Sequence, residues 1–277
     1  MKRVGILFHP MIEGANKLAE KLQKFLDSLG VSAWLCSAWE EEEVRTQIDN
    51  TDLILSIGGD GTILRSVQAV IPRLTPVTGI NLGRLGFMAE LSVDEAQDKL
   101  PDLLAGKGWI DERTMLDAEL IHPGEEGKTT FHALNDVVVG RGVIARVVYI
   151  DASIDGEPLT TYKGDGVIVA TATGSTGYSL AAGGPILHPQ AKEILLMPIL
   201  PHLSPTYAVV LPSTAVVRLH ISNTHEAILN VDGHMTLPLS NDAIITVKRS
   251  SNTARFLRIH AEKSFYGSLE WKLKGRH

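Results

Sequence analysis

A glycine-rich loop lies between two apolar runs in Leu53-Ile54-Leu55-Ser56-Ile57-Gly58-Gly59-Asp60-Gly61-Thr62-Ile63-Leu64. This order predicts a buried strand, a tight turn and a helix. Glycines let backbone N–H groups approach a phosphate, and the first turn of a helix adds a partial positive charge. Asp60 stands among these donors, where its charge would repel a phosphate unless a cation or a substrate hydroxyl lies between them. An ordinary turn would need the glycines but not the carboxylate, so the loop indicates phosphoryl chemistry.

The same alternation of strand and helix continues on both sides of this loop. Strands are expected over 4–8, 31–35, 53–57 and 76–80. Helices are expected over 18–29, over 63–71 and from Ser92, where Glu95 completes a capping box. Alternating strands and helices predict a parallel sheet that is covered on both faces.

After about Asp111 the apolar period changes to two, which predicts antiparallel strands. The alternation over 148–154 ends at Asp155-Gly156, and the alternation over 227–231 ends at Asp232-Gly233, so both are expected to be hairpins. Residues 265–273 are expected to form a helix. We therefore expect an α/β N-terminal domain with a parallel sheet over 1–112, an all-β C-terminal domain over 113–254, and a C-terminal segment, 255–277, that packs back on the first domain.

The composition is that of an acidic globular protein. The 277 residues carry a formal net charge of −6, and the pI is near 5.9. This balance argues against broad nucleic-acid binding, so a phosphate ligand must be held by local donors or a cation. Cys36 is alone, which rules out an intramolecular disulfide. No apolar run approaches the roughly 20 residues of a membrane span, and we expect a cytoplasmic protein with no membrane partner.

Further polar segments have both a binding and a structural interpretation. Residues 171–185 combine hydroxyls and glycines with Tyr178, which suits either a nucleoside-wrapping loop or a surface loop. Asn135-Asp136 interrupts an expected strand over 133–139, where polar groups need partners; ribose binding or an internal hydrogen bond would supply them. Lys163-Gly164-Asp165-Gly166 fits a plain turn equally well, and Asp232-Gly233-His234 favours a hairpin turn.

Other nucleotide and metal motifs are missing from the sequence. No Gly-x-Gly-x-x-Gly follows an expected strand. Residues 124–129 resemble a P-loop, but His122 stands where a glycine is required, and the two glutamates favour a solvated hairpin turn. The histidines show no His-Glu-x-x-His spacing and there is no Cys-x-x-Cys, so no zinc site is expected.

Taken together, the ordered segments resemble NAD kinases. The markers are 58–62, 81–87, 135–136, 163–166 and 173–185. The glycine loop alone also occurs in lipid kinases and phosphofructokinases, whereas the ordered set is specific. Three positions depart mildly from the family pattern: Ala172 replaces a frequent proline, Gly177 a common alanine, and Lys163 a common arginine, which keeps the charge but loses the bidentate fork.

The resemblance implies transfer of the γ-phosphoryl of ATP to the 2′-hydroxyl of the adenosine ribose of NAD, with NAD bound between the two domains. It implies that Asp60 is the base that accepts the proton of this hydroxyl. Mg²⁺ or another divalent cation is expected with the phosphates. The family suggests a homodimer or homotetramer. Polyphosphate in place of ATP, use of NADH and feedback by NADP stay open.

The resemblance also implies a set of binding residues, with no protein side chain assigned to a metal. The loop residues Gly58, Gly59, Gly61 and Thr62 would hold phosphates, with Arg65 nearby. Asn135 and Asp136 would hold a ribose, and Asp165 would reach the nicotinamide end. The remaining substrate-binding residues implied are Phe87, Arg146, Lys163, Thr176, Gly177, Tyr178, Ser179, Ala181 and His234.

The sequence leaves two other functions open. Another kinase with the same loop would act on a lipid or a sugar phosphate, although no stretch shows the apolar or basic face of a membrane-docking segment. A non-catalytic nucleotide sensor would keep the binding loops but would not need Asp60.

Overall fold

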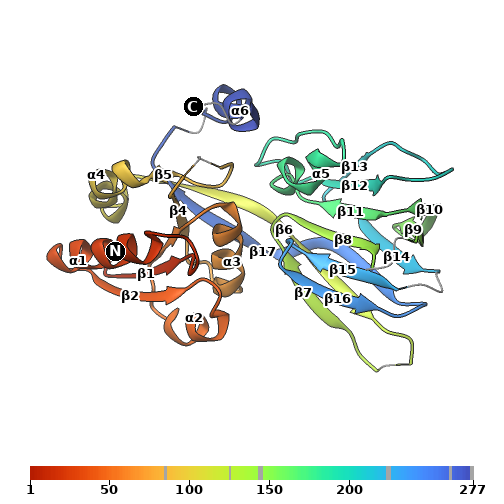
Figure 1. Cartoon of the computed structure of the whole chain (residues 1–277), viewed down its shortest axis with the longest axis horizontal. Coiled ribbons are helices and arrows are strands. Elements are labelled where there is room, and N and C mark those ends of the chain that lie inside the picture. Colours follow the sequence, from red (N-terminus) through yellow and green to blue (C-terminus); the bar gives the residue numbers. More distant parts are fainter. Residues whose placement is uncertain (84–85, 125, 143–145, 223–225, 262–263, 275–277) are drawn as a thin grey trace. The chain divides into compact units, whose positions relative to one another are not determined.

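The computed structural model describes residues 1–83, 86–124, 126–142, 146–222, 226–261 and 264–274 (Figure 1). The chain divides into two compact units, residues 1–112 with 254–277 and residues 113–253. The two unit boundaries fall inside the long strands β6 (Trp109–Ile121) and β17 (Ile244–Arg258). Among the described residues, no helix is both long and apolar enough to cross a membrane.

The first unit is built on a parallel sheet, as predicted. Its strand order is β2-β1-β3-β4, with β5 and the last residues of β17 both paired with β4. The strands are β1 (Arg3–Phe8), β2 (Ser32–Ser37), β3 (Leu53–Ile57), β4 (Val77–Asn81) and β5 (Leu91–Ser92). The helices are α1 (Ala15–Ser28), α2 (Glu41–Gln47), α3 (Asp60–Val70), α4 (Val93–Leu104) and α6 (Ser264–Lys274).

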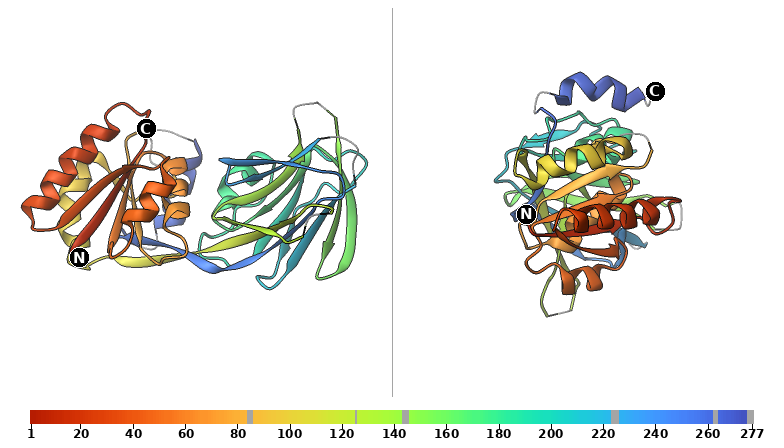
Figure 2. Two further views of the ribbon diagram at one scale, coloured as in Figure 1. Left: turned by 90° about the horizontal axis from the view of Figure 1, so that it is seen from below. Right: turned by 90° about the vertical axis from the view of Figure 1, so that its left-hand side faces the viewer.

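Helices cover both faces of this sheet because side chains alternate along each strand. Leu53, Leu55 and Ile57 point to one face, where they share a core with α1 and α4. Ser56 points to the other face and accepts a hydrogen bond from Ser66 of α3 at 2.8 Å. Figure 2 shows the red helix α1 and the yellow helix α4 on one side of the strands and the orange α3 on the other.

The predicted capping box is confirmed at the start of α4. The Ser92 hydroxyl accepts from the backbone N–H of Glu95, and the Glu95 carboxylate accepts from the backbone N–H of Ser92. The sequence patterns did not predict α2. Only Val44 of this helix is fully buried, so it has no apolar stripe to reveal it.

The second unit contains two antiparallel layers that enclose one core. One layer has the order β10-β9-β14-β17-β6-β7, and the other has the order β13-β12-β11-β8-β15-β16. Val137 and Val167 from the second layer and Leu219 and Val247 from the first belong to a single buried cluster. The new strands are β7 (Thr129–Ala133), β8 (Asp136–Arg141), β9 (Val148–Ile154), β10 (Glu157–Gly164), β11 (Gly166–Ala170), β12 (Ile194–Ile199), β13 (Val209–Leu211), β14 (Val216–Ile221), β15 (Ala227–Val231) and β16 (Met235–Leu239).

Both predicted Asp-Gly hairpins are present. Asp155 and Gly156 have φ of 53° and 88°, and Asp232 and Gly233 have φ of 51° and 72°. Positive φ at both central residues is the turn geometry that matches the twist of the flanking strands. The segment 122–128 also connects two paired strands, β6 and β7, although Glu125 lies outside the described residues.

One expectation about local structure is wrong. Asn135 and Asp136 do not interrupt a continuous strand, because β7 ends at Ala133 and β8 begins at Asp136. The chain leaves one layer at this point and enters the other. It does the same at Asp165, between β10 and β11. Each such passage breaks the ladder of backbone hydrogen bonds, so the freed groups need other partners.

Candidate functional site

One side of the glycine loop of the first unit is closely packed, and the other side faces open space. Gly58 directly follows β3, and a Cβ there would lie 2.2 Å from Oγ1 of Thr62. That hydroxyl is buried and has no hydrogen-bond partner among the described residues. By contrast, a Cβ at Gly59 or Gly61 would meet nothing within 4 Å. The loop therefore leaves open space over backbone donors at the start of α3, where an anion is favoured.

Asp60 is fixed by a second loop of the same unit. Its Oδ2 accepts from the backbone N–H of Phe87 at 2.9 Å, and its Oδ1 accepts from that of Met88 at 3.2 Å. A Cβ at Gly86 would lie 2.3 Å from Oδ1 of Asp60, so only glycine allows this approach. The predicted motif over 81–87 thus serves, in its described part, to hold the carboxylate; Arg84 and Leu85 of that motif lie outside the described residues.

A buried ionic network supports this second loop. Arg258 of β17 donates to the backbone carbonyl of Met88 at 2.7 Å. Its guanidinium also contacts the carboxylates of Glu90 at 3.4 Å and Asp111 at 3.2 Å. All three charged side chains are buried away from water, so each charge is stabilised by its contacts with the others. The residue whose N–H orients Asp60 is therefore itself anchored through its carbonyl.

Two other predicted residues of the first unit lie near aromatic or cationic partners. Arg65 of α3 places its guanidinium over the ring of Trp39, 4.5 Å from the centroid. The ammonium of Lys272 in α6 lies 5.7 Å from the ring centroid of Phe87. Stacking restrains Arg65 while leaving its donors in the plane of the guanidinium free to bind an anion.

The second unit contains a cavity of about 640 Å³. It is lined by four predicted residues, Asn135, Asp136, Asp165 and Tyr178. The rest of its described lining is Val138, Gly140, Arg141, Gly142, Ile199, Ile228, Asn230, Asp232 and Gly233. The chain crosses from one layer to the other at 134–135 and again at Asp165, and both crossings place polar side chains in the lining of this cavity.

Asp232 builds one wall of this cavity, a role that the sequence did not reveal. Its carboxylate accepts from the backbone N–H groups of Leu134 at 2.8 Å, Asn135 at 2.7 Å and Asp136 at 3.1 Å. These are the groups freed where β7 ends. The Asp-Gly turn signal was correctly interpreted as a hairpin, but nothing local indicates a partner about a hundred residues away.

Arg141 is a second lining residue that sequence analysis missed. Its Nε lies 3.4 Å from Oδ1 of Asp165, and its backbone N–H donates to the carbonyl of Asp165 at 3.0 Å. The N–H of Asp165 in turn donates to the carbonyl of Ile199 at 3.0 Å. These contacts hold Asp165 at the passage between β10 and β11.

Asp136 is a strongly perturbed carboxyl group in the lining of the cavity. Burial, and then the neighbouring charge of Asp232, raise its pKa from 3.8 to about 7. The side-chain oxygen of Asn135 beside it is buried without a hydrogen-bond partner among the described residues. The cavity therefore contains an acceptor, the Asn135 oxygen, that no described residue satisfies.

The hydroxyl-rich loop over 171–185 is not a surface loop, because four of its hydroxyl residues are buried. It includes a 3₁₀ turn at Gly174–Thr176 and the short helix α5 at Tyr178–Ala181. Its hydroxyls donate within the unit: Thr176 to the carbonyl of Thr173 at 3.1 Å, and Ser179 to Sδ of Met197 at 3.2 Å. A Cβ at Gly174 would lie 2.0 Å from the carbonyl oxygen of Asn135, so this loop packs directly on the polar passage. Tyr178 is the residue of this loop that lines the cavity, and it is exposed.

The other predicted residues lie outside the described lining of the cavity. Lys163 of β10 holds its ammonium 5.4 Å from the ring centroid of Tyr149. Nδ1 of His234 lies 3.3 Å from the carbonyl oxygen of Asp232. Arg146 is exposed. The full set outside this lining is Arg146, Lys163, Thr176, Gly177, Ser179, Ala181 and His234.

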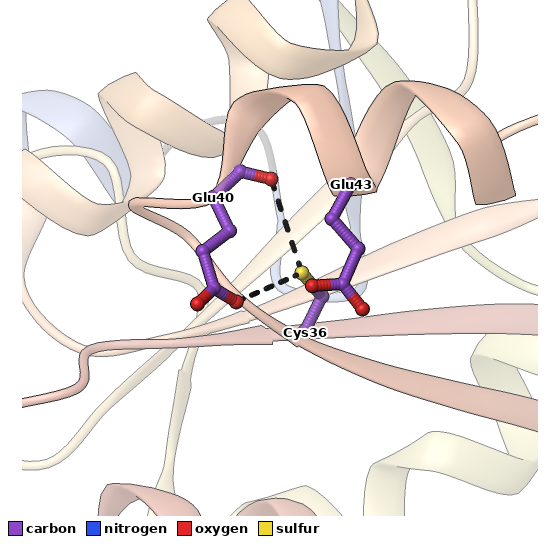
Figure 3. A group of neighbouring side chains, drawn as sticks. All are labelled: Cys36, Glu40 and Glu43. Carbon is purple, nitrogen blue, oxygen red and sulfur yellow. Dashed lines mark hydrogen bonds between the residues drawn. The ribbon is translucent and has the colours of Figure 1, made fainter.

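A separate cluster in the first unit brings a thiol near two carboxylates. The ligand atoms of Cys36, Glu40 and Glu43 lie within 4.8 Å of one another (Figure 3). Burial and the charges of the two glutamates raise the pKa of the Cys36 thiol to about 12. The thiol thus keeps its proton at neutral pH and is neither a nucleophile nor a ready metal ligand there.

Comparisons with known proteins agree with these two units. Residues 13–108 match the model of the ATP-NAD kinase N-terminal domain, and residues 134–259 match that of the ATP-NAD kinase C-terminal domain. An NAD kinase of Dehalococcoides mccartyi is 46% identical over 276 residues, covering 100% of this chain and 97% of the relative. An NAD kinase of Chloroflexus aggregans is 38% identical over 275 residues, covering 99% of each chain.

Two solved structures share the fold over nearly the whole chain. The yeast NADH kinase complexed with NADH has a TM-score of 0.87 and 26% identity, covering 98% of this chain and 87% of its own. An NAD kinase from Archaeoglobus fulgidus in complex with ATP has a TM-score of 0.79 and 25% identity, covering 99% and 100%. The fold, the glycine loop and these relatives define a phosphotransferase. The chain belongs to the NAD kinase family.

Proposed function

We propose that this chain transfers the γ-phosphoryl of ATP to the 2′-hydroxyl of the adenosine ribose of NAD and so forms NADP. The observation that carries the proposal is the position of Asp60. Its carboxylate is held at the first turn of α3 by the N–H groups of Phe87 and Met88, beside two glycines with open space above them. A base and a phosphate-binding backbone are thereby joined in one loop.

Asp60 would act as the proton acceptor for the attacking hydroxyl. An ordinary aspartate is a weak base, so it would accept the proton late, as the loose transition state builds charge on the attacking oxygen. Such help is typically worth about 10²- to 10⁴-fold in rate. The N–H groups of Phe87 and Met88 fix the carboxylate in place, so no binding energy is needed to orient it during the reaction.

The rest of the glycine loop would bind the phosphates of ATP. The loop residues Gly58, Gly59, Gly61 and Thr62 would surround the phosphates at a helix N-terminus. The N–H groups of Gly58 and Thr62 already donate to the carbonyls of Ile80 and Gly59, so the backbone donors would come from Gly59 and Gly61. Arg65 adds a positive charge from the same helix, held over Trp39. These groups would neutralise charge without a general positive field, which the net charge of −6 does not provide.

A divalent cation, most simply Mg²⁺, fits this arrangement. Mg²⁺ usually keeps several waters and binds through one or two carboxylates together with substrate phosphates. Asp60 is the single carboxylate in the loop 58–62, and among the described residues one N–H donates to each of its oxygens, so lone pairs remain available. When bound, the cation supplies charge neutralisation on the transferred phosphoryl group.

The cavity of the second unit would bind NAD. Its acceptors at Asn135, Asp136 and Asp165 suit ribose hydroxyls and amide groups, and the ring of Tyr178 offers a face for stacking. The remaining residues of the second unit that the family pattern implies are proposed to complete the binding of the dinucleotide. They are Arg146, Lys163, Thr176, Gly177, Ser179, Ala181 and His234. Yeast NADH kinase in its complex binds NADH, and the archaeal relative binds ATP.

The cellular setting is also a proposal. We propose a cytoplasmic enzyme of NADP biosynthesis that assembles as a homodimer or homotetramer. Light scattering coupled to size exclusion measures the assembly, and a monomer at micromolar concentration would contradict it.

A coupled assay of NADP formation tests the function. Purified protein with Mg²⁺ is given NAD or NADH and either ATP or polyphosphate, and NADP is detected with an NADP-specific dehydrogenase. We expect NADP from NAD and ATP, and none when Mg²⁺ is chelated. Phosphorylation of diacylglycerol or fructose 6-phosphate instead of NAD would show another kinase. Binding of NAD with no NADP formed would show a sensor.

A further inference from the structure

The backbone of Met88 is held by hydrogen bonds on both sides of its Cα. Its N–H donates to Oδ1 of Asp60 at 3.2 Å, and its carbonyl accepts from Nη1 of Arg258 at 2.7 Å. A hydrogen bond from a charged donor is roughly twice as strong as one between neutral groups. Met88 is 3% exposed, so water competes little for this carbonyl. Arg258 therefore restrains the residue whose N–H orients the carboxylate.

The guanidinium of Arg258 is restrained in turn by three side chains. Its Nε lies 3.2 Å from Oδ2 of Asp111, and its Nη1 lies 3.4 Å from Oε2 of Glu90. One of its faces lies over the ring of Phe256, with 4.8 Å between the guanidinium carbon and the ring centroid. Contacts at two nitrogens and one face limit the group to a narrow range of orientations, including the one that donates to Met88.

Glu90 also binds the end of β17 to the loop that contains this carbonyl. Its Oε1 accepts from the backbone N–H groups of Ile259 at 2.8 Å and His260 at 2.7 Å. Its own N–H donates to the carbonyl of Gly79 in β4 at 2.9 Å. Arg258 thus reaches the carbonyl from a strand that is itself fixed to the same loop.

Stability alone does not require charged groups at this place. A buried ionic network often contributes no more to stability than apolar side chains of the same volume. What a planar guanidinium adds is direction, because its donors are arranged in a rigid fork. Here the fork joins two carboxylates to the backbone carbonyl of Met88. The geometry thus suits the orientation of a backbone segment.

We propose that Arg258 is a positioning residue for Asp60. It acts through Met88: by holding the carbonyl, it keeps the N–H of that residue where it orients the carboxylate toward the attacking hydroxyl. The inference rests on the proposed function, because it takes Asp60 as the proton acceptor.

Arg258→Lys tests this role without removing the charge that Glu90 and Asp111 require. An ammonium group lacks the planar fork and cannot hold the carbonyl and both carboxylates in the same directions. A misplacement of about 1 Å can cost roughly 100-fold in rate, and only one of several restraints is lost, so we expect kcat for NADP formation to fall about tenfold. The Kd for NAD should change less than about twofold, because the cavity belongs to the other unit.

Two further variants accompany this one. Asp111→Asn keeps the arginine and removes one of the carboxylates that orient it, so kcat should fall in the same direction with the Kd for NAD unchanged. Arg255→Lys is the matched control on the same strand. Nη2 of Arg255 lies 2.8 Å from Oε1 of Glu112, and its side chain is 36% exposed. This exposed ion pair should tolerate lysine, with kcat within about twofold of the wild type.

A double-mutant cycle with Asp60→Asn separates positioning from a general structural role. Where the base is missing, its orientation no longer limits the rate. Arg258→Lys should therefore change the residual kcat of Asp60→Asn by less than about twofold. An equal tenfold loss in both backgrounds would show that Arg258 supports the whole unit and would overturn the inference. A wild-type kcat in Arg258→Lys would overturn it as well.

Amide hydrogen exchange gives a second readout that needs no substrate. Asp60 accepts from the N–H groups of Phe87 and Met88, so both should exchange slowly in the wild type. In Arg258→Lys they should exchange about tenfold faster or more, while the amides of β1 exchange as before and show that the sheet is intact. Wild-type exchange at these two amides in Arg258→Lys overturns the inference even if kcat falls.

The outcomes separate this inference from the proposed function. A wild type that forms NADP, together with an Arg258→Lys variant of unchanged kcat, overturns the inference and leaves the function standing. A wild type that forms no NADP from NAD and ATP overturns the function. Amide exchange then decides the inference alone: faster exchange at Phe87 and Met88 in Arg258→Lys supports the hold on Asp60, and unchanged exchange overturns it.

Discussion

Gly86→Ala tests how tightly Asp60 must be held. The added Cβ would lie 2.3 Å from Oδ1, 2.5 Å from Cγ and 2.5 Å from Oδ2 of Asp60. Ordinary contacts of a Cβ begin near 3.4 Å, so the carboxylate must move by about 1 Å. That shift breaks its hydrogen bonds from Phe87 and Met88. A misplacement of about 1 Å can lower a rate by roughly 100-fold, and we expect kcat for NADP formation to fall by about that factor.

The assay compares kcat, NAD affinity and thermal stability in three proteins. Gly86→Ala should lower kcat while NAD affinity changes little, because the cavity belongs to the other unit. Its stability should fall by about 1–3 kcal/mol, as for other overpacked sites. Gly83→Ala is the matched control in the same loop, since a Cβ there meets nothing within 4 Å. A kcat for Gly86→Ala within about threefold of wild type, or an equal loss in Gly83→Ala, would refute the reasoning.

Two further predictions concern the first unit. Ser92→Ala removes the hydroxyl of the α4 capping box and should lower the free energy of unfolding in urea by about 1 kcal/mol. The hydrogen bonds from the backbone N–H and the hydroxyl of Ser92 lower the pKa of Glu95. The part of the difference that comes from the hydroxyl should be lost as the pH falls from 4.5 through the lowered pKa, whereas the part that comes from the N–H of Glu95 capped by Ser92 should remain; a difference that does not shrink there would contradict the assignment. Cys36 is 5% exposed and its pKa is raised to about 12, so a thiol reagent at pH 8 should label it only after unfolding. Rapid labelling of the native protein would show that the thiolate is accessible.

The elements that the sequence predicted are those determined by local chemistry. The apolar run before Gly58 and the amphipathic run after it specify a strand, a turn and a helix without help from the rest of the chain. The capping box at Ser92 and the hairpins at Asp155-Gly156 and Asp232-Gly233 depend on residues no more than three apart. Short-range preferences of this kind are encoded in adjacent residues, so a pattern finds them.

The features that the sequence did not reveal depend on contacts between distant segments. Asp232 satisfies backbone groups at 134–136 that become free only because the chain changes layer there. The polar pair Asn135-Asp136 therefore marks the end of one strand and the start of another, not the middle of one. The hydroxyls over 171–185 suggested ligand contacts, yet several donate within the protein, because this loop is packed on the same passage. Such partners follow from the tertiary fold, which residue spacing alone does not specify.

Asp60→Asn is the most direct test of the account, which assigns the transfer of a hydroxyl proton to one carboxylate. The substitution keeps the volume of the side chain and removes its capacity to accept that proton. We predict that kcat for NADP formation falls at least about a hundredfold while the Kd for NAD, measured by titration calorimetry, stays within about twofold of the wild type. Turnover close to that of the wild type, with NAD still bound, would contradict the assignment.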